Sequence, residues 1–118
     1  LKVSAPFHCS LMKPAENSMK EKIAKTKFIN PIFKIINNVT ATPENNSEKI
    51  KELLVKQISS TVKWRDSIIN MSTSGVKNFI EVGPGKALSG MIKRTIKEAN
   101  CFSINSITDI KNLTNEFK

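Results

Sequence analysis

The spacing of apolar residues near the start of the chain predicts an amphipathic helix. Residues 11–26 carry an apolar side chain every three or four positions, at Met12, Ala15, Met19 and Ile23. This spacing places them on one helical face. Pro14 would lie in the first turn, where proline is tolerated because its missing N–H has no helical partner there.

A run with high β propensity follows this helix. It consists of Ile32, Phe33, Lys34, Ile35 and Ile36, and it lies between Pro31 and a pair of asparagines. Apolar and β-branched residues bounded in this way predict a buried strand over 32–36. Residues 40–46 contain Pro43 and are predicted to form a loop.

Two more helices are predicted in the middle of the chain. Residues 46–48 are Asn, Ser and Glu, which provide a cap and an acidic first turn. One face of the helix that follows carries Ile50, Leu53, Leu54, Gln57 and Ile58. A further helix is predicted from Trp64 to Ser72, and it stops at Gly75 as a helix with a C-terminal glycine cap does.

The last part of the chain predicts two strands that alternate with helices. A strand over 77–82 leads through a tight turn at 82–85 into a helix over 86–98. The inward face of that helix carries Leu88, Met91, Ile92 and Ile96. A short strand near 102–104 and a helix from about 108 to 117 complete the pattern. The alternation indicates one domain of the α/β class, over residues 1–118, with mainly parallel strands and flanking helices.

Composition narrows the class of protein further. The chain has 118 residues, of which 39% are hydrophobic, and no apolar run reaches the roughly 20 residues that cross a bilayer. Its first residues lack the apolar stretch of a signal peptide, so we expect a cytoplasmic protein with no membrane association. Cys9 and Cys101 lie far apart with no CxxC motif, which predicts two reduced thiols and no metal site.

The net charge of +9, from 19 basic and 10 acidic residues, is compatible with nucleic acid, a membrane surface or an acidic protein as partner. Only Arg65 and Arg94 are arginines; the other basic residues are lysines scattered along the chain. A module that binds nucleic acid would place aromatic residues among its basic ones. The six phenylalanines fall mostly at predicted core positions and there is no tyrosine, so we do not expect nucleic acid as a partner.

Three segments are candidates for chemistry. His8 follows Pro6 in the loop before the first helix, where its ring could act as a general base or only cap the helix. The Gly-Pro-Gly-Lys turn at 83–86 could present backbone N–H groups to an anion or could simply pack between strand and helix. Residues 55–64 form a corner between two helices, with Trp64 as a core anchor.

Taken together, these segments resemble the malonyl-CoA:acyl carrier protein transacylases. The resemblance extends over essentially the whole chain, in the order and spacing of five pieces. They are VSAPFH at 3–8, NNV at 37–39, VKQ at 55–57, FIEVGPGK at 79–86 and IKR at 92–94. The resemblance implies the second half of the family's large subdomain, which is similar to an α/β hydrolase.

The same resemblance implies catalytic roles for two residues. In the family a serine in a GHSxGE segment attacks the malonyl thioester, and a histidine that matches His8 takes the serine proton. A backbone carbonyl, at a glutamine that matches Gln57, orients the histidine ring in place of an acidic side chain. Malonyl-CoA and the phosphopantetheinyl carrier protein are then substrates and partners, and no cofactor or metal is expected.

This sequence contains neither GHSxGE nor a GxSxG nucleophile motif. The arginine that binds the malonyl carboxylate in the family also belongs to the N-terminal portion. We therefore expect a C-terminal fragment that is inactive alone, with open sheet edges and an apolar face that docks on the missing N-terminal portion. The alternatives are part of a polyketide synthase acyltransferase domain, and a non-catalytic remnant or interaction module.

Overall fold

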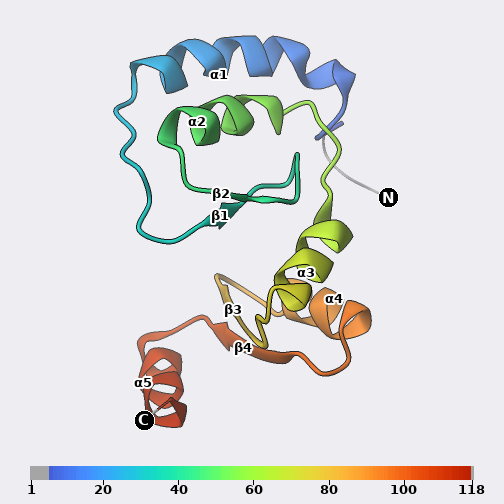
Figure 1. The fold of residues 1–118 in the computed structure, drawn as a ribbon, viewed down its shortest axis with the longest axis vertical. Helices are drawn as coiled ribbons and strands as arrows, with labels where there is room; N and C mark the ends of the chain where they lie inside the picture. Colours follow the sequence, from blue (N-terminus) through green and yellow to red (C-terminus); the bar gives the residue numbers. More distant parts are fainter. Residues whose placement is uncertain (1–5, 118) are drawn as a thin grey trace. The chain divides into compact units, whose positions relative to one another are not determined.

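The computed structural model describes residues 6–117 (Figure 1). The chain divides into two compact units between Ser67 and Ile68. Residues 3–5 of the VSAPFH piece, and Lys118, lie outside the described residues.

Two helices build most of the first unit. A short 3-10 helix, η1 (Ser10–Met12), leads into α1 (Lys13–Lys25), which confirms the helix predicted over 11–26 with Pro14 at its start. Helix α2 (Ser47–Lys56) packs along α1 (Figure 1). The side chain of Asn46 accepts a hydrogen bond from the Lys49 N–H at 2.9 Å and so caps α2 as the sequence predicted.

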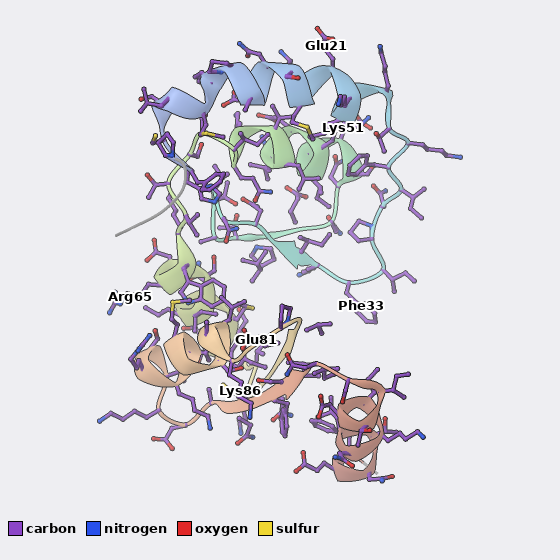
Figure 2. All side chains as sticks on the ribbon, turned by 180° about the vertical axis from the view of Figure 1, so that it is seen from behind. Glu21, Phe33, Lys51, Arg65, Glu81 and Lys86 are labelled. Atoms are coloured by element: carbon purple, nitrogen blue, oxygen red, sulfur yellow. The ribbon has the colours of Figure 1, made fainter. Side chains whose placement is uncertain are left out.

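The buried strand predicted over 32–36 is wrong. Only β1 (Ile35–Ile36) pairs, antiparallel, with β2 (Pro43–Glu44) in the predicted loop. Ile32 and Phe33 are 94% and 81% exposed, and Figure 2 shows Phe33 projecting from the loop that precedes β1. A β-rich run becomes a buried strand only where neighbours cover it, and a partner of two residues is too short to do so.

The buried apolar side chains of the first unit are Ala41, Ile50 and Leu53. Two of them belong to the apolar face predicted for α2. The unit closes where the Lys63 N–H donates to the carbonyl of Asn38 at 2.9 Å. Helix α3 (Trp64–Thr73) begins there and ends before Gly75, whose φ of +94° is the left-handed conformation that a C-terminal glycine cap requires.

The second unit contains a strand–helix–strand arrangement. β3 (Asn78–Val82) pairs in parallel with β4 (Asn100–Ile104). Helix α4 (Ala87–Thr95) connects them and packs on both strands, and α5 (Ile107–Glu116) packs on β4 (Figure 1). This confirms a partial α/β fold with a parallel strand pair and flanking helices. None of the helices within residues 6–117 is long and apolar enough to span a membrane.

Two predicted boundaries in the second unit are wrong. α4 ends at Thr95 rather than continuing to 98, because Ile96 is already extended, at φ −127° and ψ 103°. A turn with the Ala99 N–H donating to the Ile96 carbonyl then starts β4 at Asn100, two residues before the predicted strand. Leu88, predicted inward, is 40% exposed because it lies in the first turn of α4, at the end of the strand pair.

Alternation along the strands separates two faces of the parallel pair. Glu81 bonds with Ser89 of α4, so one face lies under α4. On the other face, Phe102 makes an edge-to-face contact with Phe117 at 5.4 Å between ring centroids. Ile80 and Val82 share this second face by alternation and are 48% and 78% exposed. The second face is therefore covered over β4 but largely open over β3.

Candidate active site

His8 occupies an unusual position on the backbone. Its φ of +56° is in the left-handed region, which costs a residue other than glycine about 1–2 kcal/mol. Immediately after it, the Met12 N–H donates to the Cys9 carbonyl at 3.0 Å, and the thiol of Cys9 donates to the carbonyl of Pro6 at 3.1 Å. These local bonds turn the chain into η1 and leave the exposed ring of His8 projecting from the turn.

The ring of His8 is hydrogen-bonded to the main chain of Gln57, the residue that the family resemblance paired with it. Nδ1 lies 2.8 Å from the carbonyl oxygen of Gln57, 49 positions along the chain. Because a carbonyl oxygen can only accept, Nδ1 carries the proton and donates. In the neutral ring Nε2 is then the basic nitrogen, and no hydrogen-bond partner for it occurs among residues 6–117.

Gln57 can offer this carbonyl because it ends α2. Its own N–H still donates to the Leu53 carbonyl at 3.0 Å, whereas the last carbonyls of a helix have no helical partner. The structure thus brings together the two predicted site residues, His8 through its side chain and Gln57 through its main chain. Their catalytic roles stay predictions.

A second connection lies beside this pair and was not predicted from the sequence. The Ser59 hydroxyl donates to Oε2 of Glu16 on α1, and Lys13 Nζ donates to both oxygens of the same carboxylate at 2.8 and 2.9 Å. The bond from Lys13, followed by that from Ser59, lowers the pKa of Glu16. Only the i, i+3 spacing of Lys13 and Glu16 is readable from the sequence, since Ser59 lies 43 positions away.

After the Gly-Pro-Gly-Lys turn of the second unit, a carboxylate of the preceding strand accepts hydrogen bonds from the first turn of α4. The carboxylate of Glu81 accepts from the N–H groups of Leu88 and Ser89 at 3.1 and 2.8 Å, and from the Ser89 hydroxyl at 2.7 Å. These hydrogen bonds lower the pKa of Glu81, and the bond from the Ser89 hydroxyl has the largest effect. The Gly85 N–H donates to the side chain of Asn105. Glu81 and Lys86 flank the turn in Figure 2, and the turn connects β3 to α4.

Comparison with known proteins relates the chain to part of a longer enzyme. No family model matches. The malonyl CoA-acyl carrier protein transacylase of Escherichia coli K12 is 39% identical over 105 residues, which are 89% of this chain. This chain is homologous to the C-terminal portion of the malonyl CoA-acyl carrier protein transacylases.

Solved structures agree with this relationship. An acyl-carrier-protein S-malonyltransferase from Bartonella henselae matches 98% of the chain with a TM-score of 0.92 and 37% identity. A malonyl-transacylase solved in complex with its type II PKS acyl-carrier protein in the holo form matches 98% with a TM-score of 0.87 and 33% identity. The chain spans about a third of these relatives, 34% of the Escherichia coli protein and 37% and 38% of the two solved chains.

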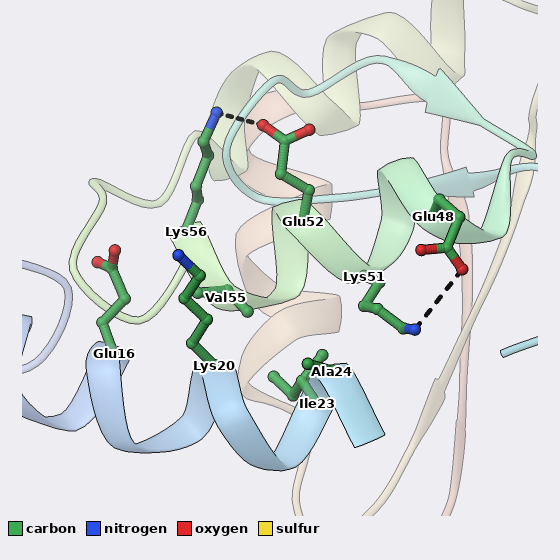
Figure 3. Close-up of a pocket in the computed structure, with 9 residues that line it drawn as sticks. All are labelled: Glu16, Lys20, Ile23, Ala24, Glu48, Lys51, Glu52, Val55 and Lys56. Carbon is green, nitrogen blue, oxygen red and sulfur yellow. Dashed lines mark ion pairs between the residues drawn. The ribbon is translucent and has the colours of Figure 1, made fainter. Parts of the chain in front are cut away.

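A groove of about 360 Å³ lies between α1 and α2 in the first unit. Figure 3 shows lysines and glutamates from both helices around its apolar floor of Ile23, Ala24 and Val55. Lys51 pairs with Glu48 at 3.5 Å, and Lys56 pairs with Glu52. Because three lysines and three glutamates line the groove, it does not select an ion of one sign.

The two cysteines lie in different units. Cys9 and Cys101 are both free thiols, and burial raises the pKa of Cys101, which disfavours its reactive thiolate. Within residues 6–117 no group of three or more histidine, cysteine, aspartate or glutamate side chains could hold a metal ion.

Proposed function

We propose that this chain supplies the histidine-bearing part of a malonyl-CoA:acyl carrier protein transacylase, the enzyme that moves a malonyl group from coenzyme A to a carrier protein for fatty acid synthesis. One observation carries the proposal: the 2.8 Å bond between His8 Nδ1 and the Gln57 carbonyl. It joins two residues that the resemblance to the family had selected as a catalytic pair.

The proposed chemistry uses Nε2 of His8 as the base. A serine hydroxyl from the rest of the enzyme loses its proton to Nε2 and attacks the malonyl thioester carbonyl. As the carbon–sulfur bond breaks, the imidazolium returns that proton to the coenzyme A thiolate. In the second half, Nε2 takes the proton of the phosphopantetheine thiol, the thiolate attacks the malonyl–serine ester, and the serine oxygen leaves with the proton.

The main chain of Gln57 acts only through orientation and charge. Its carbonyl accepts the Nδ1 proton of His8, which keeps the lone pair of Nε2 directed at the reacting serine. The partial negative charge of the carbonyl also favours the imidazolium formed midway. Because the main chain does this work, substitution of the Gln57 side chain should change the rate little.

Malonyl-CoA and acyl carrier protein are the proposed partners. A related malonyl-transacylase was solved in complex with its type II PKS acyl-carrier protein, and carrier proteins and coenzyme A are anionic. The net charge of +9 is suited to steering either one towards the site. Without GHSxGE in its sequence, the chain alone has no nucleophile for the first step and should be inactive.

The remaining N-terminal portion of the enzyme is the third proposed partner. Relatives are about three times longer than this chain, which covers 34% of the Escherichia coli protein. In the first unit Ile32 and Phe33 are exposed, and in the second unit Ile80 and Val82 lie on the open face over β3. Exposed apolar side chains on this scale are typical of surfaces that another polypeptide covers.

The test is a malonyl-transfer assay with three samples. They are the chain alone, the chain mixed with a separately made N-terminal portion that contains GHSxGE, and the same mixture with His8→Ala. We expect transfer only in the second sample, and a loss of about 100- to 10,000-fold with His8→Ala, the usual contribution of a general base. Gln57→Ala is the matched control and should retain activity.

Two results would contradict the proposal. Activity of the chain alone would mean that it does not depend on a serine from elsewhere. Inactivity of every mixture, with no association of the pieces, would favour a remnant or interaction module that keeps only the fold.

A further inference from the structure

The carbonyl of Gln57 sits at a corner that its own backbone holds loosely. After α2 the Ile58 N–H donates to Val55 and the Ser59 N–H to Lys56, each at 3.3 Å. Both bonds span three residues and are longer than the usual 2.9–3.0 Å. A carbonyl at such a corner can rotate unless something outside the helix holds the corner in place.

Ser59 provides that hold. Its hydroxyl donates to Glu16 on α1, and Lys13 in turn donates to both carboxylate oxygens of Glu16. The Glu16 side chain is only 12% exposed, so water competes little for this carboxylate. Figure 3 shows Glu16 pointing from α1 towards the corner that follows α2.

The same two segments carry both partners of the catalytic bond. His8 lies just before η1, which continues into α1, and Gln57 lies two residues before Ser59. The Glu16–Ser59 bond and the His8–Gln57 bond therefore both connect the segment that contains His8, η1 and α1 with the end of α2. His8 also keeps a left-handed φ of +56°, a conformation that persists where surrounding contacts over-determine it.

We infer that Glu16 and Ser59 are positioning residues for the catalytic histidine. By tying the corner after α2 to α1, they hold the Gln57 carbonyl against Nδ1 of His8 and so keep the ring in the tautomer whose Nε2 is basic. This inference rests on the proposed function for its catalytic meaning, but its structural claim concerns the histidine ring alone.

The experiment uses the single histidine of the chain as its own reporter. Nitrogen-15 in the His8 ring gives one pair of ring signals, whose shifts distinguish the Nδ1–H from the Nε2–H tautomer at about pH 9, where an imidazole is neutral. The variants are Ser59→Ala and Glu16→Ala, each of which removes one side of the bond. Ser59→Thr keeps the hydroxyl, and Glu21→Ala is the matched control, since Glu21 is an exposed glutamate on the same helix that points away from α2 in Figure 2.

We expect the unaltered chain to populate mainly the Nδ1–H tautomer. Ser59→Ala and Glu16→Ala should each lower the ratio of Nδ1–H to Nε2–H by about fivefold, the factor that one net hydrogen bond contributes. Ser59→Thr and Glu21→Ala should leave the ratio unchanged. Amide spectra establish that each variant is folded, and if Ser59→Ala unfolds, Glu16→Ala tests the same bond from the other side.

The inference is overturned if the folded Ser59→Ala or Glu16→Ala chain keeps the tautomer ratio of the unaltered one, or if the unaltered chain is mainly Nε2–H. In the reconstituted transfer assay, the two alanine variants should lower kcat by about tenfold with KM nearly unchanged. A mixture that transfers no malonyl group, with the tautomer shift still present, would reject the proposed function and leave the positioning of His8 standing.

Discussion

The two units differ in how far along the sequence their defining contacts reach. In the first unit, the polar contacts of the site join residues 49 and 43 positions apart, His8 with Gln57 and Glu16 with Ser59. In the second unit, polar contacts join residues that are closer along the chain: Asn78 with Asn100, Gly85 with Asn105 and Glu81 with Ser89, which are 22, 20 and 8 positions apart. Of these features, the sequence predicted the tight turn at 82–85, which acts over a few residues, whereas the geometry of the candidate site depends on how α1 and α2 pack.

The largest effects on this comparison between the two units are expected from removing one core side chain of each. Phe79→Ala in β3 should lower the free energy of unfolding by about 3–5 kcal/mol, and Leu53→Ala in α2 by about 2–5 kcal/mol. Both side chains are buried, at 7% and 4% exposure. Chemical denaturation measures the two losses.

The two core variants should differ at the site. Leu53→Ala should also disturb the His8 ring signals, because Leu53 is in the helix that carries Gln57 at its end. If folded Leu53→Ala leaves these signals unchanged, the site does not depend on the packing of α2.

A smaller effect is expected from the local cap of the second unit. Glu81→Ala removes the carboxylate that accepts three hydrogen bonds from the first residues of α4. Loss of such a cap should lower Tm by about 5 °C, measured by circular dichroism. Glu98→Ala changes the same charge outside this cap and is the control; an equal fall in Tm for the two variants would argue against capping by Glu81.

The smallest effect is expected from the surface charges of α2. Hydrogen bonds from Lys49, and then Lys56, lower the pKa of Glu52 from 4.5 to about 2. Because the folded chain holds this carboxylate ionised more strongly than the unfolded one, the stabilisation is complete above pH 4.5 and is lost as the pH falls towards about 2.

The ion pairs of Glu52 are about half exposed, so solvent screens them and the difference in Tm should be about 2 °C or less. Thermal melts of the unaltered chain and Glu52→Gln should diverge at neutral pH and converge near pH 2. A constant difference across this range would mean that the charge of Glu52 is not the cause.

Elements that short sequence patterns specify were predicted correctly, and elements that depend on distant neighbours were not. The helices at α1, α2 and α3 were predicted from apolar spacing, from the Asn46 cap and from Gly75, all of which act within one helical turn. The prediction of a buried strand over 32–36 was wrong because burial depends on neighbouring elements, and no element of the first unit covers Ile32 and Phe33. The end of α4 was missed because no glycine or proline marks it.

The sequence by itself determined most of the succession of helices and strands, the tight turn at 82–85, and, through its family resemblance, the candidate pair of His8 and Gln57, with the Gln57 carbonyl as the group that orients the ring. The tertiary structure added which ring nitrogen of His8 meets the Gln57 carbonyl, namely Nδ1 at 2.8 Å. It alone showed that Glu16 and Ser59 join beside this pair. The physical reason is that turns, caps and helical faces are set by bonds over a few residues. A hydrogen bond across more than forty positions exists only once packing has brought two helices together.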